Sequence, residues 1–388
     1  MRKFFNFFVL TLFVVAANIV TIRAQNALRP LGEASRQIVA TNSASITSSP
    51  ARSQTVVSAL SSLPEADTLI YINPHRILNE AVPKLLPAKD VEGMQKAFED
   101  IKKNAGVDPA KVDYIVVAIR TKKPTADLNF QPPEFLVVAS GDFSAESILT
   151  LARMASQGKL RDEKYGNKTL GLMTIDPIAK EAEKNPFLKS LSEVGIVTLN
   201  ANTIAAGTPA YLRAAVDAGD GKERISTETL NSLVRDTNAL ISIAGTPWHS
   251  FAKSFGMLGT EANARAARCE SKIGDFYGSL TMDATNFIVR GVMNADNPDT
   301  AKIMSKLFSG LLQHATGSIK EPSAQSTVKS FAITAEGDEV LLSGEISQQI
   351  VIDLIQKQMK PKESEATSVQ PATKPAVKKR RVRRRAKP

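Results

Sequence analysis

The residues with the most direct capacity for metal or nucleophilic chemistry are three histidines and one cysteine. His75, His249 and His314 lie far apart, without the short spacings that bring imidazoles onto one metal ion. Cys269 lies in the stretch ANARAARCESK, which predicts a helix, and no histidine is near it in sequence to act as its base. We therefore expect a structural thiol, and we predict neither a metal site nor a cofactor.

Serine and carboxylate chemistry is equally hard to assign. The chain has no Gly-x-Ser-x-Gly elbow, and SGDFS, which ends at Ser144, is better explained as a strand end followed by a helix cap. Asp142, Asp283 and Asp296 lie at expected strand ends or loops, where acids usually cap or are solvated. No working acid–base pair can be chosen, so an enzyme with an unrecognised site remains an alternative.

The tetrapeptide Ala-Gly-Thr-Pro occurs twice, at residues 206–209 and 244–247, each time between an expected strand and an expected helix. Proline suits the first helical position because its missing N–H has no partner there, and the preceding threonine can cap free amides. A phosphate cradle would need more glycines and a lysine followed by serine or threonine, which Gly221-Lys222-Glu223 does not supply. We interpret both copies as helix-start signals, with an anion at the helix N-terminus as the alternative.

The C-terminal stretch KPAVKKRRVRRRAKP carries the strongest local signal, because its nine basic residues are accompanied by no acid and no aromatic. Such a segment cannot bury a core and should stay disordered, free to bind polyanions by charge. Anionic envelope polymer or lipid headgroups are the expected partners, and nucleic acid is possible. The predicted polyanion-binding residues are Lys374, Lys378, Lys379, Arg380, Arg381, Arg383, Arg384, Arg385 and Lys387.

The net charge of +10 is concentrated at the two ends of the chain. Residues 360–388 hold eleven Lys or Arg and two Glu, and the first 24 residues hold three basic residues, which leaves about −2 for residues 25–359. The basic start, the apolar run from Phe4 to Val20 and the small residues before a cut after Ala24 are typical of a cleaved export signal. An uncleaved anchor is the alternative; after cleavage we expect no integral membrane span.

The elements that follow predict an α+β fold made of two tandem related modules. Each half shows a strand, two helices, two strands, a helix, a hairpin and a final helix, and the first half has one extra strand and helix. This order predicts, for each half, an antiparallel sheet with helices packed on one face. The expected segments are a signal peptide (1–24), a Ser/Thr/Ala-rich spacer (25–62), module 1 (63–238), module 2 (239–359) and a disordered basic tail (360–388). Whether the two halves share one core is left open.

The stretch LPEADTLIYIN, from Leu63 to Asn73, follows the leader and spacer and resembles the opening of a broad group of exported bacterial proteins that carry a domain of unknown function. The resemblance covers residues 63–359 and implies an envelope protein, with no catalytic residues to transfer. We expect a non-enzymatic protein of the periplasm or cell envelope, whose body binds or scaffolds and whose tail tethers it. The other hypotheses are the enzyme named above and an anchored nucleic-acid-binding protein.

Overall fold

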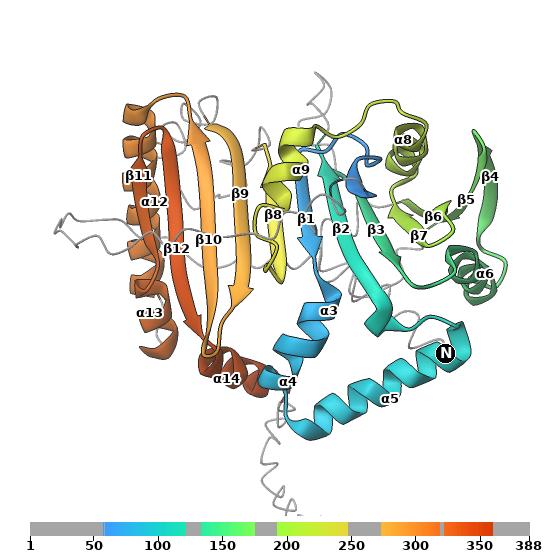
Figure 1. Cartoon of the computed structure of the whole chain (residues 1–388), viewed down its shortest axis with the longest axis horizontal. Coiled ribbons are helices and arrows are strands. Elements are labelled where there is room, and N and C mark those ends of the chain that lie inside the picture. The colour runs from blue at the N-terminus through green and yellow to red at the C-terminus, as the bar shows by residue number, and fades with distance from the viewer. Residues whose placement is uncertain are drawn as a thin grey trace, which may run out of the picture.

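The computed structural model describes residues 57, 59–121, 133–174, 192–246, 273–318 and 322–359 (Figure 1). The expected leader, most of the expected spacer and the basic tail lie outside these residues. His249, Cys269 and the second Thr-Pro helix start lie outside them as well.

Twelve strands form one continuous sheet in which all neighbouring strands are antiparallel. Its order is β11-β12-β10-β9-β8-β1-β2-β3-β7-β6-β5-β4, so strands from the two halves of the chain occupy opposite halves of the sheet. The predicted hairpins β6–β7, β9–β10 and β11–β12 are confirmed. The strands are β1 (Thr68–Ile72), β2 (Val112–Arg120), β3 (Glu134–Gly141), β4 (Arg161–Tyr165), β5 (Lys168–Thr174), β6 (Glu193–Asn200), β7 (Thr203–Gly207), β8 (Ile241–Gly245), β9 (Ile273–Met282), β10 (Asn286–Ala295), β11 (Ala332–Glu336) and β12 (Glu339–Ser347).

Several helices begin directly after a residue whose side chain caps them. Asn73, Ser144 and Asn297 each accept a hydrogen bond from a backbone N–H of the first turn that follows. Helices α9 and α13 were not predicted from the sequence. The helical segments are α3 (Pro74–Arg76), the π-helix η1 (Ile77–Ala81), α4 (Val82–Leu85), α5 (Ala88–Ala105), the 3-10 helix η2 (Pro109–Lys111), α6 (Ala145–Ser156), α8 (Pro209–Gly219), α9 (Thr227–Leu233), α12 (Pro298–Ser318), α13 (Pro322–Lys329) and α14 (Gln348–Met359). Within the described residues, no helix combines the length and apolar character needed to cross a membrane.

The helices cover both faces of the sheet, so the expectation of helices on one face was wrong. On β7, Ala205 packs in the same core as α8, whereas its neighbour Ile204 packs on the opposite face with Ala145 and Ile148 of α6. Successive strand residues point to opposite faces. The central strands are nearly continuous apolar runs, as in Glu134–Gly141, where seven of eight residues are buried. Strands that are apolar on both faces must be packed against other elements on both faces to exclude water.

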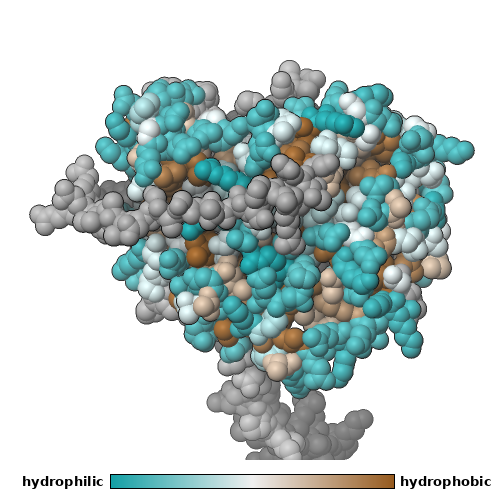
Figure 2. All heavy atoms as spheres, viewed as in Figure 1, coloured by the Kyte–Doolittle hydropathy of each residue, from teal (hydrophilic) through white to brown (hydrophobic). Residues whose placement is uncertain are grey.

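The packed body also begins earlier than expected. Leu60, which the sequence placed in the flexible spacer, is fully buried in the main core with Leu63 and Leu69. Its side chain lies in the same core cluster as Tyr211 and Leu212 of α8. Burying a leucine side chain contributes roughly 1.5–3 kcal/mol to the stability of the fold, so the segment around Leu60 is packed against the folded body. Figure 2 shows that other apolar residues still reach the surface in separate patches on the side in view.

The two Ala-Gly-Thr-Pro motifs make the same backbone contact. Thr208 N–H donates to the Phe135 carbonyl at 3.0 Å, and Thr246 N–H donates to the Asp67 carbonyl at 2.8 Å. A Cβ on Gly207 would lie 2.2 Å from the first carbonyl oxygen, and one on Gly245 would lie 2.0 Å from the second. Because Gly207 and Gly245 lack a side chain, the end of each strand can pack closely against the backbone next to it. The Thr208 side chain does not cap α8, so that part of the expectation was wrong.

Candidate binding site at the seam between β1 and β8

The two halves of the sheet meet where β1 pairs with β8, and we call this pairing the seam. Its register runs from Thr68 opposite Gly245 to Ile72 opposite Ile241. At the end of β1, Asn73 N–H donates to the Leu240 carbonyl at 2.9 Å and so extends the ladder. The seam is thus a main-chain junction, and the side chains of the residues that flank it decide its chemistry.

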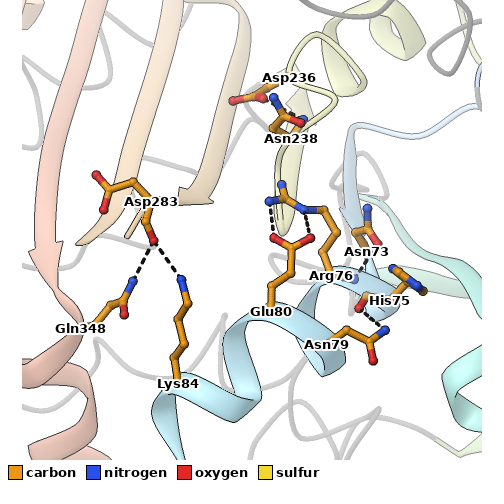
Figure 3. A network of polar contacts seen from close by, with 10 residues as sticks. All are labelled: Asn73, His75, Arg76, Asn79, Glu80, Lys84, Asp236, Asn238, Asp283 and Gln348. Carbon is orange, nitrogen blue, oxygen red and sulfur yellow. Dashed lines mark hydrogen bonds and ion pairs between the residues drawn. The ribbon is translucent and has the colours of Figure 1, made fainter. Parts of the chain in front are cut away.

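Directly after β1, α3 and η1 hold a two-pronged ion pair (Figure 3). Arg76 donates to Glu80 from Nε at 2.8 Å and from Nη2 at 2.5 Å. The arginine side chain is only 15% exposed, whereas the glutamate is 42% exposed. The hydrogen bonds from Arg76 hold the pKa of Glu80 below its ordinary value. The π-helical turn that carries Glu80 is a rare geometry that often occurs at functional sites.

The third nitrogen of this guanidinium, Nη1, takes no part in the pair with Glu80. Arg76 Nη1 is buried and makes no hydrogen bond within the described part of the chain. In Figure 3 the guanidinium points toward the loop of Asp236 and Asn238, which precedes β8. The Asp236 carboxylate contributes to raising the pKa of Arg76, although the hydrogen bond to Glu80 is the largest cause. The Asp236 carboxylate therefore faces the Arg76 guanidinium across the seam.

Asp236 is the most buried acid at the seam, with 5% of its surface exposed. It accepts hydrogen bonds from Asn238 N–H at 3.0 Å and from the Ser279 hydroxyl on β9 at 3.2 Å. Two more buried hydroxyls lie on β8 and β9. Ser242 on β8 lacks a hydrogen-bond partner in the described ranges, and the Tyr277 hydroxyl on β9 lies near Ser279 and the Asp236 backbone. Burial raises the pKa of Tyr277. Neutral hydroxyls with unused donors are suited to bind an acceptor.

A second group of contacts joins α4 and α14 to the turn between β9 and β10 (Figure 3). The Asp283 carbonyl accepts from Lys84 Nζ of α4 at 3.3 Å and from Gln348 Nε2 of α14 at 3.0 Å. Its carboxylate accepts from the backbone N–H groups of Thr285 and Asn286, which hold the pKa of Asp283 below its ordinary value. Asp283 is a turn-capping acid, as its loop position indicated.

The remaining residues selected from the sequence are not brought together. His75 is exposed on α3, and its carbonyl accepts from Asn79 Nδ2, while His314 lies on α12. Asp142 pairs with Lys111 at the surface, and Asp296 is exposed before α12. Within the described ranges, no group of three or more His, Cys, Asp or Glu side chains could hold a metal ion. The nine tail residues lie outside those ranges.

The sequence analysis missed the residues that define the seam. The i,i+4 spacing of Arg76 and Glu80 was a signal for an ion pair on a helix. The contacts of Asp236 with Ser279 and Arg76 could not be predicted locally, because both residues are distant in sequence and are brought to it only by the strand order.

The comparisons with known proteins give no family. No protein-family model matches the chain, and none of the curated proteins matches it in sequence. Among solved structures, crystal form III of TP0453 is similar at a TM-score of 0.41 and 11% identity, covering 77% of this chain and 97% of that one. Crystal form IV of TP0453 gives 0.39 and 10%, covering 76% of this chain and 95% of that one. We base no argument on likeness at this level.

Proposed function

We propose that this is a non-enzymatic exported protein of the bacterial envelope, with a binding or scaffolding body and a basic tail that holds it to an anionic surface. The observation that carries the proposal is the segregation of charge. Nine basic residues occupy Lys374–Pro388 without an acid, while residues 25–359 are near neutral. Each Lys or Arg near an anionic membrane surface contributes about 1 kcal/mol of attraction. The tail therefore supplies most of the charge available for tethering.

Export rests on the leader pattern of residues 1–24. We expect the protein recovered from the envelope fraction of a bacterial host to begin at Gln25. Intact-mass measurement of that fraction tests this expectation. A chain that retains Met1 to Ala24 and sediments with membranes would favour an uncleaved anchor instead.

The topology supports the proposal that the body is a structural duplication. In sheet order, β1-β2-β3-β7-β6 in one half corresponds to β8-β9-β10-β12-β11 in the other. In each half the last two strands form a hairpin whose second strand pairs with the third strand of that half. The β4–β5 hairpin is extra in the first half. Two modules joined edge to edge would form one broad body suited to binding or scaffolding.

Replacing the nine basic tail residues by glutamine is expected to abolish binding of the protein to vesicles that contain anionic lipid. Binding of the unchanged protein should weaken steeply as salt is raised, because exposed charges are screened. Vesicle co-sedimentation across a salt series measures both effects. Neutral vesicles should bind neither protein.

A tail with the same residues in scrambled order is the matched control, and it should bind as the natural tail does. If the glutamine variant still binds anionic vesicles, the tail is not the tether and the proposal fails. Binding only to duplex DNA, with a log–log salt slope of about −0.9 per neutralised phosphate, would assign the tail to nucleic acid instead.

A further inference from the structure

The face of the sheet beside the seam carries a row of polar side chains on strands of the second half. Opposite residues of paired strands share a face, and the register places Ser242, Ser279, Arg290 and Ser343 side by side across β8, β9, β10 and β12. The adjoining row on the same face contains Tyr277. This row therefore brings one arginine into line with three hydroxyls.

Two arginines at this row have no carboxylate partner among the described residues. Arg290 is half-buried in the middle of β10 and makes no ion pair there. Arg235 is exposed, and its guanidinium carbon lies 5.9 Å from the centre of the Tyr277 ring. Guanidinium groups bind carboxylate and phosphate through paired hydrogen bonds. An arginine on a sheet face that forms no ion pair within the described part of the chain is available for such an anion.

Two hydroxyls on the same face of the sheet are buried. Ser242 is 1% exposed, and its hydroxyl has no hydrogen-bond partner in the part of the chain that the structure describes. Tyr277 is 9% exposed, and its hydroxyl lies near Ser279 and the Asp236 backbone. A buried unpaired polar group costs roughly 1–3 kcal/mol, so such groups usually have a partner in the working protein. Both hydroxyls can donate to an anion held by the arginines.

Two of the acids near the row accept hydrogen bonds. Asp236 accepts from Ser279 and Asn238 and faces Arg76. Glu345, on β12, accepts from Asn286 Nδ2 at 3.3 Å. Neither acid forms an ion pair with Arg235 or Arg290 in the described part of the chain.

Apolar side chains flank the row on the same face. Ile288 and Val292 lie on either side of Arg290 along β10, and Leu341 lies opposite Val292 on β12. All three are half-buried. A free inorganic anion would gain nothing from these neighbours, whereas a hydrocarbon chain attached to the anion would bury them.

We propose that this face binds the anionic headgroup of an amphiphile, with Arg290 and Arg235 holding the carboxylate or phosphate and Tyr277 and Ser242 donating to it. The hydrocarbon chain lies over Ile288, Val292 and Leu341. This inference rests on the proposed binding role of the body and names the class of ligand. It does not depend on the tail.

Laurate, below its micelle concentration, is the probe, and calorimetric titration of the full chain is the measurement. Laurate is expected to bind at least tenfold more tightly than lauryl alcohol and than inorganic phosphate. Arg290→Gln should weaken laurate binding about tenfold, and Tyr277→Phe should weaken it by a smaller factor. Arg161→Gln, which removes an equal charge from an arginine that is 61% exposed on β4, is the matched control and should leave binding unchanged.

All variants keep the tail, so a difference between them reports on the body alone. Equal binding of laurate by Arg290→Gln and the unchanged protein would overturn the site, and so would phosphate or lauryl alcohol binding as tightly as laurate. Thermal unfolding of Arg290→Gln should match that of the unchanged protein, which separates lost binding from lost folding. Vesicle binding through the tail can succeed or fail independently of this result.

Discussion

Gly245→Ala is expected to lower the free energy of unfolding by about 3 kcal/mol, because the added Cβ would strike the neighbouring strand. That Cβ would lie 2.0 Å from the Asp67 carbonyl oxygen and 2.9 Å from Thr68 Cα, and both are backbone atoms that cannot rotate away. Moving β8 outward would also stretch the hydrogen bond from Thr246 N–H to Asp67. Urea unfolding should show a lower midpoint with an unchanged slope.

Two further glycines make this test specific to the close approach. Gly207→Ala should destabilise in the same way, since its Cβ would lie 2.2 Å from the Phe135 carbonyl oxygen. Gly93→Ala, in α5, meets nothing within 4 Å and should stabilise the protein by roughly 0.5–1 kcal/mol, as alanine does in a helix interior. A Gly245→Ala protein with the urea midpoint of the unchanged protein would contradict the register of β1 against β8.

Asp236→Leu is expected to have an effect of similar size, about 3 kcal/mol of lost stability. Leucine removes the acceptor of Asn238 N–H and of the Ser279 hydroxyl, and a buried donor such as the Ser279 hydroxyl costs roughly 1–3 kcal/mol when it is left unpaired. Arg76 also loses the negative charge that it faces across the seam. The measurement is again the urea midpoint, followed by near-ultraviolet circular dichroism.

Asp236→Asn is the matched control, because its amide oxygen keeps one acceptor while the charge is lost. We expect it to cost about 1 kcal/mol. If leucine and asparagine prove equally harmful, the charge facing Arg76 matters more than the two accepted hydrogen bonds. If both leave stability unchanged, Asp236 does not join the loop to β9, and the account of the seam is wrong.

Local patterns predicted most of the individual elements. The alternation in residues 276–282, the turn residues Glu336–Glu339 and the capping residues Asn73 and Ser144 all correspond to observed elements. Strand alternation, turns and caps depend on residues a few positions apart, so they can be predicted from a single sequence. The β4 strand, RDEKY, escaped prediction because it is charged and lies at an edge of the sheet.

By itself the sequence determined the α+β class, most strands and helices, and the concentration of positive charge in the last residues of the chain. Only the tertiary structure decided that the strands join in one sheet, that helices cover both faces, and that Arg76, Asp236 and Ser279 meet at the seam. The reason is physical. Strand order and register are set by packing between segments far apart in the chain, and a one-residue shift would move every side chain of a strand to the other face.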